Sequence, residues 1–232
     1  MKNGLIGILA GMGPRSTAPF IDLVVDECQY QYGAVYDEEF PPMMIYSLPT
    51  PFYVDRPIDD ELMKKTIIKG LKKLEETGAA FIAMPCNSAH IYFKELENSI
   101  SIPLLNIVTE TLNSLPKKSK RVTLFSTAST FKAQIYQKEI ITSGHDFIFS
   151  NQWQITIDRL IQSIKLNRDN PENIEIWKEI LDEVKEEGIE SIIIACTDLN
   201  AVTDKVKTEV RIVDSASCLA KTVIRNYLQI IE

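Results

Sequence analysis

The sequence predicts an α/β protein of two pseudosymmetric lobes, each a short, mostly parallel sheet flanked by helices. Short apolar runs alternate with segments of helical periodicity, which is the pattern of βαβ units. The pattern occurs twice, and residues 71–88 align without a gap with residues 181–198. Each copy holds an amphipathic helix, a glycine, an apolar run and a cysteine. We therefore expect an active site in the cleft between the lobes, at the carboxyl ends of the strands.

The elements follow the chain in two series. In the first series we expect strands at 5–9, 43–48, 80–84 and 102–105, with helices at 16–29, 59–77, from about Asn87, and at 108–114. In the second we expect strands at 121–125, 147–149, 189–195 and 210–213, with helices at 129–142, 155–166, 172–187 and 215–230. Gly78 and Gly188 occupy the positions where a helix ends in a left-handed residue. We assign residues 1–101 and 209–232 to the first lobe and residues 102–208 to the second.

Composition excludes several classes of protein. The chain has 232 residues, 45% of them hydrophobic, and no apolar run long enough to cross a bilayer. Its net charge of -7 disfavours nucleic-acid binding, which needs a positive surface. Four irregularly spaced cysteines and an opening that does not resemble a secretory signal predict free thiols and a cytoplasmic location.

The duplicated cysteines, Cys86 and Cys196, are the strongest candidates for catalysis. Each ends an apolar strand and precedes polar residues that can open a helix, so the helix N-terminus would favour the thiolate. Asp198 lies two residues beyond Cys196 and would accept or orient its proton. The alternative is that each cysteine is a small buried hydrophobe. We assign Cys28 and Cys218 to that second category.

Two loops and one histidine complete the set of candidates. The turn from Gly11 to Ser16 lacks the third glycine of a dinucleotide fingerprint, but its backbone N–H groups can bind a small anion such as a carboxylate. The corresponding segment of the second half places Ser126, Thr127 and Thr130 toward the same cleft. His90, four residues after Cys86, could ligate a metal with the two cysteines, although a hydrogen bond within the helix is the commoner fate. We therefore predict no metal site.

Five motifs together resemble the aspartate/glutamate racemase family, in particular its aspartate racemase branch. They are Gly11-Met-Gly-Pro, Cys86-Asn-Ser-Ala-His90, Thr127-Ala-Ser-Thr130 with Tyr136, Ala195-Cys-Thr-Asp198, and Val213-Asp-Ser215. The resemblance spans nearly the whole chain. It implies a cofactor-independent racemase in which two opposed cysteines remove and return the α-proton of an acidic amino acid, aspartate before glutamate. A homodimer is one assembly that the resemblance allows.

The resemblance also implies a set of substrate contacts. These are Met12, Gly13, Asn87, Ser88, Thr127, Ser129, Thr130 and Thr197 for the substrate carboxylates, with Lys165 and Arg56 for the distal carboxylate. Departures from the usual motif at Ser129 and Asp198 leave the side chain of the substrate open.

Other functions stay open at this stage. One alternative is an isomerase or decarboxylase that uses a single cysteine on a dicarboxylic acid, which two intact cysteine motifs disfavour. Another is an amino-acid-binding protein without catalytic activity. A zinc hydrolase comes third.

Overall fold

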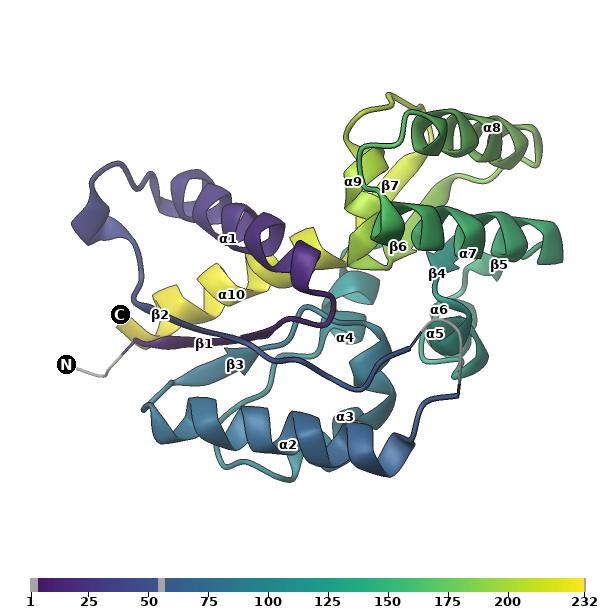
Figure 1. Cartoon of the computed structure of the whole chain (residues 1–232). Coiled ribbons are helices and arrows are strands. Elements are labelled where there is room, and N and C mark those ends of the chain that lie inside the picture. Colours follow the sequence, from purple (N-terminus) through teal and green to yellow (C-terminus); the bar gives the residue numbers. More distant parts are fainter. Residues whose placement is uncertain (1–3, 54–56, 232) are drawn as a thin grey trace. The chain divides into compact units, whose positions relative to one another are not determined.

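A computed structural model of the chain describes residues 4–53 and 57–231 (Figure 1). The chain divides into two compact units. The first comprises residues up to 107 together with those from 216 onward, and the second comprises residues 108–215. Both units are α/β structures with parallel strands, as predicted from the alternation of apolar runs and helical segments.

The unit boundaries differ from those expected from the sequence by about half a dozen residues. Leu104 forms a parallel bridge with Ile82, which ties the segment before residue 108 to the first sheet. The strand β7 (Arg211–Asp214) pairs with β6 (Ser191–Ala195), so it belongs to the second sheet instead of the first lobe. Backbone hydrogen bonds between strands, invisible in a single sequence, decide both assignments.

The first unit is a parallel sheet covered by helices on both faces. Its strands β1 (Ile6–Ala10), β2 (Met43–Ser47) and β3 (Phe81–Ala83) lie in the order β2-β1-β3. Figure 1 shows α1 (Thr17–Tyr32) and α10 (Ser215–Ile231) over one face, with α2 (Asp60–Glu76) and α3 (Phe93–Glu97) over the other. Three short 3-10 helices, Pro14–Ser16, Asp37–Glu39 and Ser88–Tyr92, complete the connections.

A fourth strand was expected at residues 102–105, but the structure reduces it to the single bridge at Leu104. Pro103 has no N–H to donate to a ladder. Its carbonyl still accepts from the Ile82 N–H at 2.8 Å, and the Leu105 N–H donates to the Ile82 carbonyl at 2.9 Å. The segment thus occupies the fourth position of the sheet without extending as a strand.

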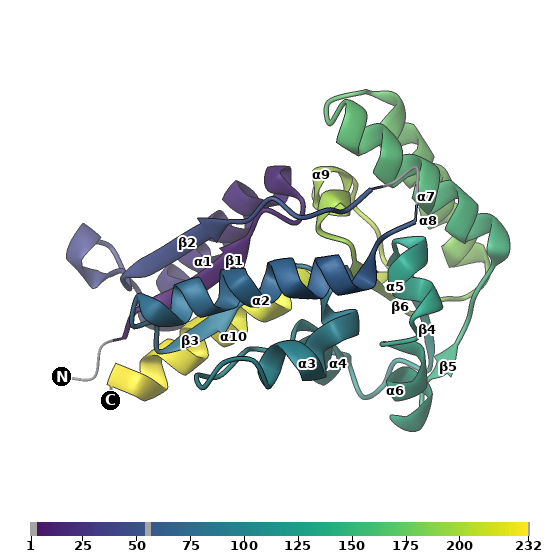
Figure 2. The same cartoon turned by 60° about the horizontal axis from the view of Figure 1, so that its bottom comes forward.

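The second unit has four parallel strands. They are β4 (Arg121–Ser126), β5 (Asp146–Phe147), β6 and β7, in the order β5-β4-β6-β7. The helices α7 (Asn151–Leu166) and α8 (Glu172–Glu186) pack side by side against this sheet (Figure 2). Phe125 meets Trp153 and Trp177 edge to face in their shared core. The remaining helices are α4 (Ile107–Asn113), α5 (Ala128–Lys132), α6 (Gln137–Thr142) and α9 (Asn200–Thr203), with a 3-10 helix at Thr197–Leu199.

The long helix expected at 129–142 is broken into α5 and α6. Gln134, between them, has a left-handed φ of 55°. The Gln137 side chain donates to the Phe131 carbonyl at 2.7 Å across the break, and Tyr136 is fully buried. Burial of an aromatic ring therefore overrides the local helical propensity.

The two units share one order of strands. The order is β2-β1-β3 followed by the bridge at Leu104 in the first unit, and β5-β4-β6-β7 in the second. Numbered along the chain within each unit, both orders read second, first, third, fourth. Gly78 and Gly188, which precede the third strands, have φ of 81° and 67°, as predicted. Within the described ranges, no helix is both long and apolar enough to cross a membrane.

Candidate active site

The first unit places its glycine loop directly after β1. Gly11 has a φ of 92°, and a Cβ at this residue would lie 2.5 Å from the backbone nitrogen of Leu48. Its N–H donates to the Thr17 hydroxyl at 3.2 Å, which ties the loop to the start of α1. Only glycine fits this position, because both the backbone conformation and the neighbouring strand exclude a side chain.

Cys86 lies beside this loop. It follows β3 by three residues, and its side chain is half-buried. Together with Met12, Gly13 and Ser16, Cys86 lines a shallow hollow at the end of the sheet. The Cys86 N–H donates to the Met84 carbonyl at 2.8 Å, which turns the chain away from the strand. The thiol and the exposed backbone of the glycine loop thus share one face of the first unit.

His90 is a neutral structural residue of this loop. Its Nδ1 lies 2.8 Å from the Cys86 carbonyl and must donate to it, while Nε2 accepts from the Ile107 N–H at 3.2 Å. Burial lowers the pKa of His90 to about 4. Both ring nitrogens are occupied by backbone groups, so His90 is not available to a metal. Across the described residues, no three His, Cys, Asp or Glu side chains lie close enough to hold one.

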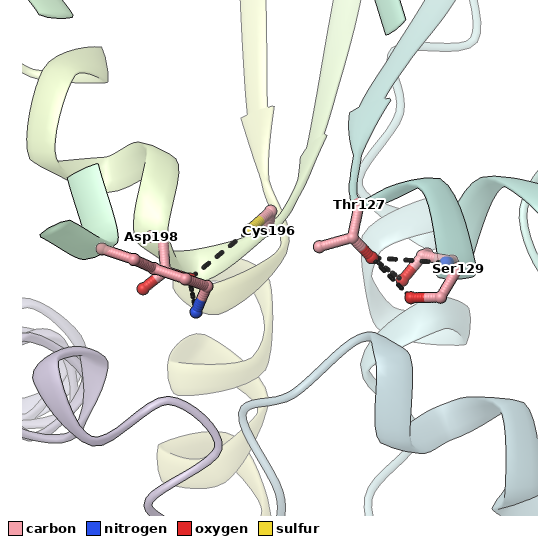
Figure 3. Close-up of polar contacts among 6 residues, drawn as sticks. Thr127, Ser129, Cys196 and Asp198 are labelled. Atoms are coloured by element: carbon pink, nitrogen blue, oxygen red, sulfur yellow. Dashed lines mark hydrogen bonds and ion pairs between the residues drawn. The ribbon is translucent and has the colours of Figure 1, made fainter. Parts of the chain in front are cut away.

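The second unit places the carboxylate of Asp198 beside Cys196 (Figure 3). Cys196 directly follows β6 and is 7% exposed. Its Sγ lies 3.9 Å from Oδ2 of Asp198, and the same oxygen forms a 2.6 Å ion pair with the Lys165 ammonium. Asp198 can therefore accept a hydrogen bond from the thiol while the lysine balances its charge.

A loop of hydroxyl groups lies next to Cys196 in the sheet. Ser126 and Ala195 are paired in the register of β4 and β6, so Thr127 and Cys196 leave neighbouring strands at the same level. The Thr127 hydroxyl caps α5 by accepting from the Thr130 N–H at 3.3 Å, and it lies 3.0 Å from the Ser129 hydroxyl. Figure 3 shows this hydroxyl cluster and the Cys196–Asp198 pair at the ends of the two strands.

The other expected site residues divide into three groups. Asn87 is buried, whereas Ser88 and Thr197 are partly exposed and each begins a short 3-10 helix. Arg56 lies outside the described residues. The helices that directly follow the two cysteines are short 3-10 helices of 5 and 3 residues, and so short a helix has only a small dipole with which to stabilise a thiolate.

Two polar residues near the hydroxyl loop were missed by sequence reasoning. The Gln154 amide donates to the Ser126 carbonyl at 3.0 Å, and an Asp158 oxygen accepts from the Ala128 N–H at 3.1 Å. Burial raises the pKa of Asp158. Their spacing of four residues at the edge of the apolar stripe of α7 was the available signal, because partly buried polar positions need partners.

Comparison with known proteins identifies the family of the chain. The model of the Asp/Glu/hydantoin racemase family matches residues 9–223. The chain belongs to this family, and its enzyme class is that of the amino-acid racemases, which are isomerases.

Individual relatives cover almost the full chain. The broad specificity amino-acid racemase RacX of Bacillus subtilis (strain 168) is 47% identical over 224 residues, which is 97% of this chain and 98% of the relative. The solved structure of the Picrophilus torridus aspartate racemase has a TM-score of 0.82 and 25% identity, covering 96% of this chain and 94% of that one. The solved structure of the glutamate racemase isoform RacE1 from Bacillus anthracis has the same fold, with a TM-score of 0.66 and 16% identity. The match covers 99% of this chain and 83% of that one.

Proposed function

We propose that this protein racemises amino acids without pyridoxal phosphate or metal, with Cys86 and Cys196 as the two acid–base groups. The observation that carries the proposal is the equivalent position of the two thiols. In each unit the cysteine follows the third strand of a sheet with the same strand order. In each unit it also lies beside the loop that follows the first strand, as the hollow around Cys86 and the register of β4 and β6 indicate.

The proposed reaction is a pair of proton transfers at one α-carbon. The thiolate of one cysteine takes the α-hydrogen as a proton, and the electron pair of the broken C–H bond delocalises into the substrate carboxylate. The thiol of the other cysteine then gives its proton to the opposite face. One turnover inverts the centre and exchanges the protonation states of the two sulfurs, so the reverse reaction starts from the opposite arrangement.

The proposed substrate contacts are the backbone and hydroxyl donors of the site. The Met12–Gly13 backbone, together with Asn87 and Ser88, would serve from the first unit. From the second unit the donors would be the hydroxyls of Thr127, Ser129, Thr130 and Thr197. Donors aimed at the α-carboxylate stabilise the charge that develops there when the proton leaves, which is the largest electrostatic contribution in reactions of this kind.

The surroundings of Lys165 bear on the choice of substrate. The ammonium of Lys165 forms an ion pair with Asp198 at 2.6 Å. Because its charge is already balanced, Lys165 does not require a second carboxylate on the substrate. This fits the broad specificity named for the Bacillus subtilis relative. We therefore propose a range of substrates in which aspartate and glutamate are included but not required.

The proposed setting follows from the thiols. No disulfide joins any of the four cysteines, all of which lie within the described residues, and this suits a reducing cytoplasm. For the assembly, a homodimer stays one state that the family resemblance allows.

A chiral assay in deuterated water tests the proposal. The purified protein is incubated with the D and L forms of aspartate, glutamate and several neutral amino acids, without added pyridoxal phosphate and with a chelator. We expect inversion of several substrates and incorporation of solvent deuterium only at the α-carbon. A protein that binds amino acids but leaves the α-position unlabelled, or one whose activity requires an added metal, would contradict the proposal.

A further inference from the structure

One face of α7 carries three polar side chains that contact both loops of the second unit's site. They are Gln154, Asp158 and Lys165, spaced by four and seven residues, which places them along one side of a helix. The sequence indicates a role for Lys165 only as a substrate contact and none for the other two. Each of the three also contacts one of the protein's own loops.

The N-terminal half of this face holds the hydroxyl loop. The amide of Gln154 donates to the carbonyl of Ser126 at 3.0 Å, and Asp158 Oδ1 accepts from the N–H of Ala128 at 3.1 Å. These two backbone groups flank Thr127 on either side. A half-buried carboxylate receiving a backbone N–H is a strong, directional contact, so the position of Thr127 is fixed from both neighbours.

The C-terminal end of the same face holds the acidic partner of Cys196. The ammonium of Lys165 lies 2.6 Å from Asp198 Oδ2, and the side chains are 27% and 10% exposed. That oxygen is the one that lies 3.9 Å from the Cys196 sulfur. An ion pair shielded from solvent restricts the carboxylate more than a surface pair would.

The helix is itself firmly held. The Ser150 hydroxyl accepts from the Gln152 N–H at 3.2 Å at its N-terminus. Its apolar face is buried against the core through five large side chains, Trp153, Ile157, Leu160, Ile161 and Ile164. A rigid helix that contacts two loops at separate points fixes the spacing between them, which is what precise placement of reacting groups requires.

We propose that α7 is a brace for the active site, in which Asp158 and Lys165 are positioning residues of the racemisation reaction. The role in catalysis rests on the proposed function. Asp158 sets the hydroxyl loop, and Lys165 sets Asp198 beside Cys196. Lys165 then acts on the protein's own carboxylate, in contrast to the role as a ligand of the distal substrate carboxylate that the family resemblance implies.

Replacement of Asp158 tests the first contact. In Asp158→Ala we expect amide hydrogen exchange at Ala128 to rise about tenfold and kcat/KM to fall about ten- to hundredfold, because the loop is no longer fixed. Asp158→Asn keeps an acceptor oxygen and should restore most of both. Arg159→Ala, an exposed charge on the same helix, is the matched control and should change neither quantity.

Replacement of Lys165 tests the second contact by separating kcat from KM. In Lys165→Met we expect kcat to fall about tenfold, with KM for acidic substrates changing by less than about twofold, because ground-state binding does not use the lysine. Lys165→Arg should recover most of kcat. Lys178→Met, which removes the lysine of an exposed ion pair with Glu175, is the control and should be neutral.

Different results would overturn the role proposed for α7 and the proposed racemase activity. Unchanged exchange at Ala128 in Asp158→Ala, or a rise in KM confined to acidic substrates in Lys165→Met, would overturn the brace even in an active racemase. A wild-type protein that inverts no amino acid would end the proposed function and with it the catalytic role of α7. The exchange measurement would still decide whether Asp158 holds the loop.

Discussion

The two cysteine loops occupy equivalent places in the two units but are built from different chemistry. In the first unit the loop after the first strand turns through Gly11, with a φ of 92°. In the second unit the aligned residue is Thr127, with a φ of -62°, whose hydroxyl caps a helix. The residue two positions after the cysteine is Ser88 in one unit and Asp198 in the other. One unit therefore offers backbone donors, and the other offers hydroxyls and an ion pair.

The same contrast extends to the residues that fix each cysteine loop. His90 and Asn200 are aligned, each four residues after its cysteine. His90 links the Cys86 carbonyl to the Ile107 N–H, just beyond the fourth position of the first sheet. The Asn200 amide donates to Asp214 at 3.3 Å, at the end of the fourth strand of the second sheet. Each residue ties the loop after the third strand to the segment at the fourth position of its sheet, one through a buried neutral ring and one through an amide.

The comparison shows which features a duplicated scaffold retains. Both units have the same strand order, the same glycine after the helix that precedes the third strand, and a cysteine after that strand. These features are set by the path of the backbone. The polar groups around the thiol differ. Under the proposed mechanism, two thiols would exchange roles within one reaction without identical surroundings, and variants can test how far the equivalence goes.

The largest expected effect is the loss of either thiol. Cys86→Ser and Cys196→Ser should each reduce racemisation in both directions by about a thousandfold, because a serine hydroxyl is a much weaker acid than a thiol and forms almost no conjugate base at neutral pH. The measurement is the chiral assay from both enantiomers. Cys218→Ser on α10 is the control and should keep activity. If one of the two variants stayed active, the two cysteine loops would share a position in the fold but not a role in the reaction. A single-cysteine mechanism would then replace the proposed one.

The next effect concerns the glycine loop. Gly11→Ala should lower the free energy of unfolding by about 3 kcal/mol or more, because a Cβ would lie 2.5 Å from the Leu48 backbone at a left-handed φ. Gly33→Ala is the matched control, since Gly33 has a φ of 75° but no atom within 4 Å of the added carbon. It should cost only about 1 kcal/mol. Urea unfolding measures both, and equal losses would show that the close approach to Leu48 does not matter.

The smallest of the three effects is a pH dependence of stability that comes from His90. Its pKa is lowered from 6.5 to about 4 in the folded protein, so the unfolded chain binds a proton in this range that the folded protein does not. Stability from this group is complete above pH 6.5 and falls by about 3 kcal/mol as the pH drops to about 4.

His90→Gln isolates this contribution. Urea unfolding at pH 7.5 and pH 4.5 gives the change in the free energy of unfolding between the two pH values for the wild type and for the variant. Subtracting one change from the other removes the contribution of the carboxylates, which is the same in both proteins. The variant is expected to lose less stability on acidification than the wild type. Parallel pH profiles for the two proteins would contradict the burial of a neutral ring at this position.

The sequence by itself determined the alternation of strands and helices, the duplication and the two cysteines. Each is a local signal: an apolar run, a glycine in the left-handed region after a helix, or a motif in a fixed context. The prediction of 59–77 as a helix, observed as Asp60–Glu76, depended only on a cap and a period of 3.6 residues.

Tertiary structure decided what depends on partners distant in the chain. The ladder between β6 and β7 moved residues 209–215 to the second unit. The burial of Tyr136 broke the helix expected at 129–142. The pairing of Lys165 with Asp198, and the contacts of Gln154 and Asp158 with the hydroxyl loop, join residues about 30 positions apart. No local pattern encodes such pairs, because a buried polar group takes whichever partner the folded backbone brings within hydrogen-bond distance.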